Sequence, residues 1–301
     1  MIFSSKQNDH WQKISTCKPV ISYLSANPVV MKWFRITLYV LSVFILIRCS
    51  VAPYKLTNKS YKKQAKRFAG LLKEYPLRDS TGINYAAGFV GTTNFSMRKP
   101  SYVIIHHTAQ NSCDQTLKTF TLPRTQESAH YVICKDGTVY HMLNDYLRAH
   151  HAGVSKWGGA VDINSSSIGI ELDNNGFEQF DEQQLNSLLT LLERLKKSFN
   201  IPAANFIGHG DIAPTRKNDP NWRFPWKTLS EKGFGLWWSD TAAVQVPVNF
   251  DYLTAIRLVG YDVKDTSAAI IRFKQHFLQD TTRGMTPPAQ KVLYQLYKKY
   301  L

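Results

Sequence analysis

Residues 167–199 read SIGIELDNNGFEQFDEQQLNSLLTLLERLKKSF, a strand-like run followed by a long amphipathic helix. The run from Ser167 to Leu172 is short and mostly apolar, as expected of a buried strand. From Asp181 to Phe199 the leucines recur at the three- and four-residue spacing of a single buried helical face. A strand followed by such a helix is typical of layered α/β proteins.

Three further strand-like runs lie upstream, at Tyr102 to His106, His130 to Cys134 and Thr138 to Met142. The turn Lys135-Asp136-Gly137 joins the last two and carries a hairpin signal. Because strands and helices alternate along this part of the chain, we predict an α/β domain at residues 82–240. Its architecture is a single mixed central sheet flanked by helices.

A polar break near Ser239 to Pro247 ends this domain. Three helix-like segments follow, at about Asp251–Val259, Ser267–Leu278 and Pro288–Tyr300. They predict a small C-terminal three-helix domain at residues 246–301. The alternative is a helical cap on the α/β domain.

The loop GHGDIAPTRKNDP, residues 208–220, contains candidate metal ligands. A histidine leaving a distant strand, a second histidine on this loop and a nearby carboxylate make a three-ligand set for Zn²⁺, as a catalytic zinc requires. Adjacent strand residues point to opposite faces, so His106 and His107 cannot both easily reach one metal. Asp211 and Asp219 are rival carboxylates on the loop.

Glu171 is a carboxylate inside an otherwise apolar strand. Burying a charge there is unfavourable unless the group has a chemical task or a partner. Glu171 is therefore a candidate functional residue.

The chain has 301 residues, of which 44% are hydrophobic and 20% charged, which indicates a globular protein and excludes a disordered or collagenous one. Its net charge of +15 predicts an anionic partner. The basic residues are scattered, apart from clusters at Lys62-Arg67 and Lys298-Lys299, and no basic-aromatic module is visible. Nucleic-acid binding would rest on charge alone, so we expect no nucleic-acid partner. A membrane surface or a cell-wall polymer fits equally well.

An export signal is predicted at residues 31–49. Met31 and a short basic stretch precede the apolar run Ile36 to Ile47, which is shorter than the ~20 residues of a membrane span and matches a signal-peptide core. Residues 1–30 are polar and unpatterned, so Met31 is the expected start and the preceding segment a non-native or disordered extension. A cytoplasmic tail before a short anchor is the alternative.

Cys49 follows this apolar run and resembles the processing site of a bacterial lipoprotein. Arg48 departs from the pattern, which has a small residue directly before the cysteine. We expect an exported, outer-membrane lipoprotein on the periplasmic side with lipid on Cys49. Residues 50–81 would then be a linker with one helix.

Cys113 and Cys134 could pair in an oxidising compartment. Cys134 ends an apolar strand-like run, however, and a buried free thiol is the simpler expectation.

Five short motifs together resemble a known family. They are IIHHTA (104–109), SAHY (128–131), HHAG (150–153), SIGIEL (167–172) and the loop at 208–220. In this order they are similar to the zinc-dependent N-acetylmuramoyl-L-alanine amidases, whose fold is shared with peptidoglycan recognition proteins and a bacteriophage lysozyme-amidase. The resemblance covers roughly Gly82 to Trp238, and the tail more loosely resembles a three-helix peptidoglycan-binding domain.

The resemblance implies roles for the candidate residues. The implied zinc ligands are His106, His209 and Asp219, with Asp211 fixing the loop by hydrogen bonds to backbone amides. Glu171 would be the general base, and Lys217 would stabilise the tetrahedral intermediate. His151 and His130 would shape the substrate groove or orient a ligand; His151 is the better substrate contact, and a structural role is the alternative for His130.

The implied function is zinc-dependent hydrolysis of the amide bond between N-acetylmuramic acid and L-alanine in peptidoglycan or muropeptides. We expect a monomer. The alternative is a non-catalytic protein that recognises the same muropeptides, although fold members that only bind typically lack part of the ligand set. Here every one of those positions is filled.

Overall fold

The computed structural model describes residues 32–33, 53–73 and 90–299. Cys49 and nearly all of the predicted export signal lie outside the described residues. The chain divides into two units, Met1–Ala87 and Gly88–Leu301. None of the helices within the described ranges is both long and apolar enough to cross a membrane.

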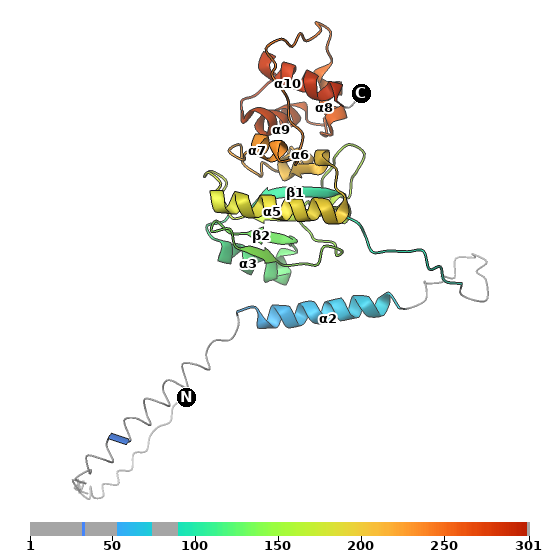
Figure 1. The fold of residues 1–301 in the computed structure, drawn as a ribbon, viewed down its shortest axis with the longest axis vertical. Helices are drawn as coiled ribbons and strands as arrows, with labels where there is room; N and C mark the ends of the chain where they lie inside the picture. Colours follow the sequence, from blue (N-terminus) through green and yellow to red (C-terminus); the bar gives the residue numbers. More distant parts are fainter. Residues whose placement is uncertain (1–31, 34–52, 74–89, 300–301) are drawn as a thin grey trace, which may run out of the picture. The chain divides into compact units, whose positions relative to one another are not determined.

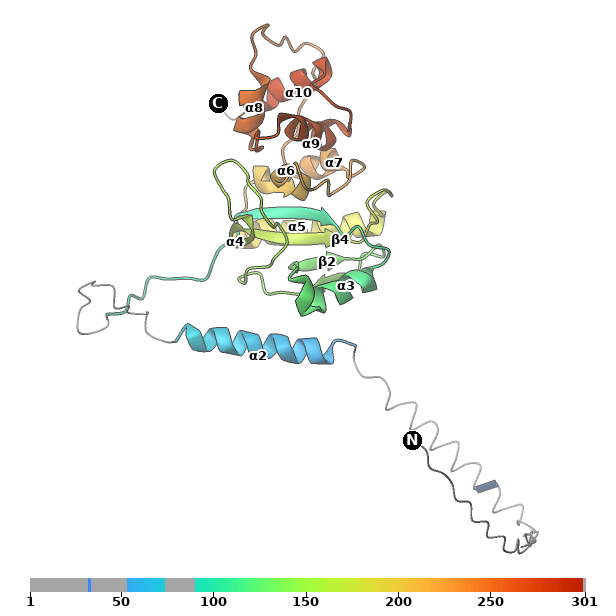
Figure 2. The ribbon, with the colours of Figure 1, turned by 180° about the vertical axis from the view of Figure 1, so that it is seen from behind.

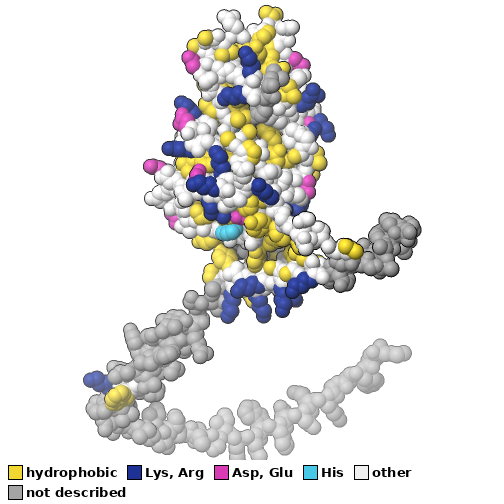
Figure 3. Space-filling view, turned by 45° about the vertical axis from the view of Figure 1, so that its right-hand side comes forward, with side chains coloured by type: hydrophobic (Ala, Val, Ile, Leu, Met, Phe, Trp, Pro, Cys, Tyr) yellow, Lys and Arg dark blue, Asp and Glu magenta, His cyan; other side chains and the backbone are white. Residues whose placement is uncertain are grey.

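In the first unit, helix α2 (Lys55–Leu71) has no buried residue. It carries six Lys or Arg and no Asp or Glu. The helix predicted between residues 50 and 80 is thus present, and Figure 3 shows Lys and Arg side chains in a row along it.

The second unit contains a mixed sheet of five strands in the order β3-β2-β4-β1-β5. Strands β1, β2, β4 and β5 are parallel, and β3 pairs antiparallel with β2. The strands are β1 Tyr102–His107, β2 Tyr131–Ile133, β3 Val139–His141, β4 Ser167–Leu172 and β5 Phe206–Gly208. The predicted α/β fold with one mixed sheet is confirmed.

The helices of this unit are shown in Figures 1 and 2. They are α3 Cys113–Thr121, α4 Ile163–Ser166, α5 Glu182–Phe199, α6 His209–Ile212, α7 Trp226–Glu231, α8 Tyr252–Val259, α9 Thr266–Leu278 and α10 Pro287–Lys298, with 3-10 turns at Pro123–Thr125 and Ala203–Asn205. The long helix α5 and the three C-terminal helices match the predicted segments to within two residues. Strand β5 and the short helices α3, α4, α6 and α7 were not predicted, because each offers too few turns or alternations to show a period.

Helix α5 covers one face of the sheet (Figure 1). Val103 and Ile105 of β1 pack in the same cluster as Leu188 and Leu192 of α5, and all four are fully buried. Ile104 belongs instead to the cluster formed with the C-terminal helices. Since side chains alternate along a strand, His106 shares its face with Ile104 and not with α5.

Strands β2 and β3 form the predicted hairpin. The turn is closed by hydrogen bonds from the Cys134 N–H to the Thr138 carbonyl and from the Gly137 N–H to the Cys134 carbonyl. Gly137 has φ +84°, a backbone conformation that favours glycine.

A disulfide joins Cys113, the first residue of α3, to Cys134, just after β2, with Cα atoms 5.4 Å apart. The expectation of a free buried thiol was therefore wrong. The short α3 was not predicted, and it is this helix that places Cys113 over the end of β2.

Helices α8, α9 and α10 lie beyond the β5 side of the sheet, and α9 packs on α6 and α7 (Figure 2). Each begins at a side-chain cap supplied by Asp251, Asp265 or Thr286. Buried residues of all three helices share one apolar cluster with Ile104 and Ile212. Within the described residues 90–299, the α/β region and the C-terminal helices therefore pack against each other in one unit.

Candidate metal centre

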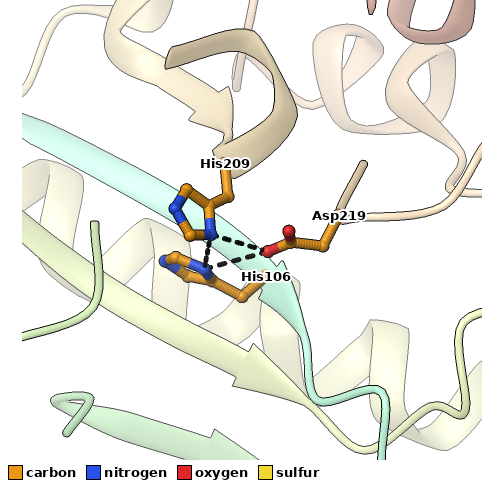
Figure 4. Close-up of side chains that lie close together, drawn as sticks. All are labelled: His106, His209 and Asp219. Carbon is orange, nitrogen blue, oxygen red and sulfur yellow. Dashed lines mark hydrogen bonds and ion pairs between the residues drawn. The ribbon is translucent and has the colours of Figure 1, made fainter. Parts of the chain in front are cut away.

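Three side chains meet beside the carboxyl ends of β1 and β5 (Figure 4). His106 lies on β1, His209 is the first residue of α6 directly after β5, and Asp219 lies on the loop that follows α6. The two Nδ1 atoms are 2.9 Å apart, and Asp219 Oδ2 is 3.1 Å from His106 Nδ1 and 3.0 Å from His209 Nδ1. Zn²⁺ bonds of about 2.0–2.1 Å in a tetrahedron place ligand atoms about 3.3 Å apart, so this buried triangle fits zinc.

Hydrogen bonds on the far side of each ring leave both Nδ1 atoms available to a metal. His209 Nε2 donates to the Ala152 carbonyl at 3.1 Å. His106 Nε2 lies 3.0 Å from His151 Nδ1. Burial lowers the pKa of His106 to about 4, which favours the neutral, metal-binding form of the imidazole.

The direction of the His106–His151 bond follows from the next residues along the network. The Ser167 hydroxyl donates to the Ile163 carbonyl at 2.6 Å, so its oxygen accepts from His151 Nε2 at 3.0 Å. His151 Nδ1 is then an acceptor, and His106 donates to it through Nε2. Such partners fix the tautomer of a ligand histidine.

His151 is buried, and both of its ring nitrogens bond to protein groups. This leaves neither nitrogen for a substrate and favours the alternative role, orienting His106. Gly169 makes room for the ring, because a Cβ there would lie 2.4 Å from His151 Cγ.

Glu171 lies beside His106 because the two residues pair across β4 and β1. Its Oε1 is 4.0 Å from His106 Nδ1, and its Oε2 is buried with no hydrogen-bond partner among the described residues. Burial, followed by the charge of Asp219, raises the pKa of Glu171 to about 8. A nearby cation would act in the opposite direction. A carboxylate with a free buried oxygen suits proton transfer to and from a small molecule.

Asp219 is an ionised partner for the two histidines. Burial alone would raise its pKa, but its interactions with His209 and His106 lower the pKa of Asp219 well below its usual range. The Asp219 carbonyl accepts a 2.7 Å hydrogen bond from the Gly210 N–H. The loop is thus closed onto α6, which sets the carboxylate opposite His209.

Asp211, the rival carboxylate, has its oxygens occupied elsewhere. Oδ2 accepts from the Gly208 N–H at 2.8 Å and from His276 Nδ1 at 2.7 Å, and Oδ1 accepts from the Tyr261 hydroxyl at 2.7 Å. The expected hydrogen bond from a backbone amide to Asp211 is therefore present. Two partners from the C-terminal region, which were not expected, accompany it.

Lys217 and His130 lie outside the triangle. Lys217 is half-buried on the same loop, and its positive charge acts to lower the pKa of Glu171 and of His106. His130 is buried; its Nδ1 accepts from the Gly169 N–H at 3.1 Å, and its Nε2 lies 3.0 Å from the Leu147 carbonyl. These contacts favour the structural alternative for His130.

Sequence reasoning missed the groups that hold the ligands in place, namely Ser167, the Ala152 carbonyl, Tyr261, Gln275 and His276. A backbone carbonyl leaves no sequence signal. Gln275 and His276 do leave one, because both are buried polar residues on α9, inside the run AIIRFKQHF that otherwise looks amphipathic.

The chain is similar to known amidases. A family model described as N-acetylmuramoyl-L-alanine amidase matches residues 96–222. The chain is 30% identical to N-acetylmuramoyl-L-alanine amidase AmiD of Escherichia coli (strain K12) over 230 residues, which is 66% of this chain and 82% of AmiD.

Two solved structures are similar in fold. One is E. coli AmiD in complex with anhydro-N-acetylmuramic acid-L-Ala-D-gamma-Glu-L-Lys, with a TM-score of 0.61 and 28% identity over 70% of this chain and 93% of that one. The other is AmpDh3 of Pseudomonas aeruginosa in complex with anhydromuramic pentapeptide, with a TM-score of 0.62 and 28% identity over 73% of this chain and 99% of that one.

Proposed function

The chain belongs to the N-acetylmuramoyl-L-alanine amidase family, and from that premise we propose that it is a zinc enzyme whose ligands are His106, His209 and Asp219. Its reaction is hydrolysis of the amide bond between N-acetylmuramic acid and L-alanine in peptidoglycan or muropeptides. The observation that carries the zinc assignment is the set of three ligand atoms 2.9–3.1 Å apart. One chain supplies all three ligands, so the site needs no second copy, and we propose that the protein is a monomer.

The residues around the triangle have separate roles in the proposed reaction. Zinc held by these three residues would supply a Lewis acid for the scissile carbonyl and would lower the pKa of water. Glu171 accepts a proton from the attacking water and returns it to the leaving amine nitrogen. Lys217 offers a positive charge to the oxyanion that develops on the carbonyl oxygen. His151 holds His106 in the tautomer that leaves Nδ1 free.

Replacing Glu171 by Gln tests this assignment. The change keeps shape but removes the base, so we expect wild-type zinc content and folding with turnover reduced about 10²–10⁴-fold. Mass spectrometry of digested muropeptides measures turnover, and elemental analysis measures zinc. The exposed Glu193 on α5, replaced by Gln, is the matched control.

Each outcome has a separate meaning. Wild-type turnover by Glu171→Gln would place the base elsewhere. A wild-type chain that binds muropeptides without cleaving them would instead support the non-catalytic alternative.

We further propose that the protein is exported and anchored by lipid on Cys49 at the outer membrane. The Cys113–Cys134 disulfide supports an oxidising compartment. The basic helix α2, which follows Cys49 in the chain, suits an anionic surface near the anchor.

Metabolic labelling with palmitate tests the anchor. We expect label on the wild type and none on Cys49→Ala, which should be released in soluble form. A Cys49→Ala protein that stays membrane-bound and uncleaved would show that the apolar segment itself is the anchor.

A further inference from the structure

The C-terminal helix α9 contacts the backbone on both sides of the proposed ligand Asp219. Gln275 donates from Nε2 to the Asn218 carbonyl at 2.7 Å and to the Pro220 carbonyl at 2.8 Å. The intervening Asp219 carbonyl accepts from the Gly210 N–H. Three consecutive carbonyls of the ligand loop are therefore each held by a donor, and one side chain of α9 supplies two of these bonds.

The Gln275 amide is itself held in one orientation. Its Oε1 accepts from the guanidinium of Arg272, one helical turn earlier, so its NH₂ group must face the loop. Arg272 also reaches the Pro214 carbonyl at 3.4 Å. Gln275 is buried, and hydrogen bonds in the protein interior are electrostatically stronger than the same bonds in water.

Helix α9 also contacts the segment that carries the ligand His209, through His276. His276 lies against the Trp226 ring at 3.9 Å, nearly parallel to it, and its Nδ1 is 2.7 Å from Asp211 Oδ2. Asp211 in turn accepts from the Gly208 N–H, which begins the turn carrying His209. Among the described residues, the contacts of His106 come instead from the pairing of β1 with β4 and from His151.

We propose that Gln275 is a positioning residue for the metal centre: the C-terminal helix α9 holds the Asp219 loop in the geometry that closes the ligand triangle. This rests on the proposed zinc site. It gives the C-terminal helices a part in metal binding, in addition to any contact with peptidoglycan. Loss of the Gln275 donors would let the Asp219 backbone relax and would weaken metal binding without removing a ligand.

Two variants of Gln275 test the role. Gln275→Met keeps length and burial but has no donor, and Gln275→Glu presents acceptors to two carbonyls. For both we expect zinc affinity to fall about 10–100-fold, the range seen when partners of metal ligands are removed. Affinity is measured by competition with a chelator, and thermal unfolding of the metal-free proteins confirms that they fold. Activity lost at limiting zinc should return at saturating zinc.

Gln295 offers a matched control on α10. Its Nε2 donates to the Asp240 carbonyl at 2.7 Å, and its Oε1 accepts from the Ser239 N–H at 2.9 Å, so it makes similar bonds to a different loop. Gln295→Met should keep wild-type zinc affinity.

Wild-type zinc affinity in either folded Gln275 variant overturns the proposal, as does an equal loss in Gln295→Met. If Gln275→Met does not fold, Gln275→Glu decides alone. A wild-type chain that binds no zinc would refute the metal site itself, and so is distinguished from failure at Gln275.

Discussion

The close approach of Gly169 to His151 gives a sharp test of how His106 is held. A Cβ built on Gly169 would lie 2.4, 2.6 and 2.7 Å from three atoms of the His151 ring. Ordinary carbon contacts are about 3.5–4.0 Å, so the ring would have to move by about 1 Å in Gly169→Ala. The ring lies between Ser167 Oγ and His106 Nε2, each 3.0 Å away, and such a shift breaks at least one of these bonds.

The expected loss of stability follows from these distances. Forcing a methyl group into a packed site costs about 1–3 kcal/mol, and a lost hydrogen bond about 0.5–1.5 kcal/mol. Together they destabilise the protein by roughly 2–4 kcal/mol. At roughly 2–4 °C per kcal/mol for a unit of this size, thermal unfolding measured by circular dichroism should shift down by roughly 4–16 °C. Zinc affinity should fall as well, by about 10–100-fold, since His106 loses its acceptor.

Two comparisons make the result decisive. Gly159 has open space at its Cβ position, and Gly159→Ala should leave unfolding and zinc affinity unchanged. In a His151→Ala background the ring is absent, so adding Gly169→Ala should cost almost nothing further. Wild-type stability of Gly169→Ala, or a full loss that persists without the His151 ring, would refute the reasoning.

Two further predictions concern stability. Cys113→Ser removes the disulfide that closes a loop with a sequence separation of 21, and we expect the free energy of unfolding to fall by about 3 kcal/mol. Denaturant titration measures this change, and equal stability of the variant and the oxidised wild type would contradict the prediction. Burial lowers the pKa of His130 from 6.5 to about 4, so the folded state favours the neutral imidazole. The folded state therefore has its full stability above pH 6.5, and protonation of His130 lowers the free energy of unfolding as the pH falls from 6.5 toward 4. At about 1.4 kcal/mol per pKa unit, this difference corresponds to roughly 3.5 kcal/mol. His130→Gln should therefore lose less stability than the wild type between about pH 7 and 4.5, and an unchanged slope of stability against pH would rule out His130 as the source.

Sequence alone determined the features that depend on local pattern. The periodic leucines of α5 and the run Ser167–Leu172 predicted a helix and a strand, because burial of one face imposes its spacing on neighbouring residues. The placement of Glu171 in an apolar strand marked it as a candidate functional residue, because burying a charge is unfavourable unless the group has a task or a partner. The motif resemblance named His106, His209 and Asp219, and the fold brings these three together.

Tertiary structure decided which distant groups meet. The pairing of Cys113 with Cys134 depends on a helix too short to show a period. His151 proved to face His106 and Ser167, and not open solvent, because Gly169 leaves space for its ring. Gln275 lies 56 residues after Asp219 in sequence, yet bonds to the carbonyls on either side of it. Such contacts arise from the packing of whole elements, and packing is decided by shape and burial across the molecule, which no local spacing encodes.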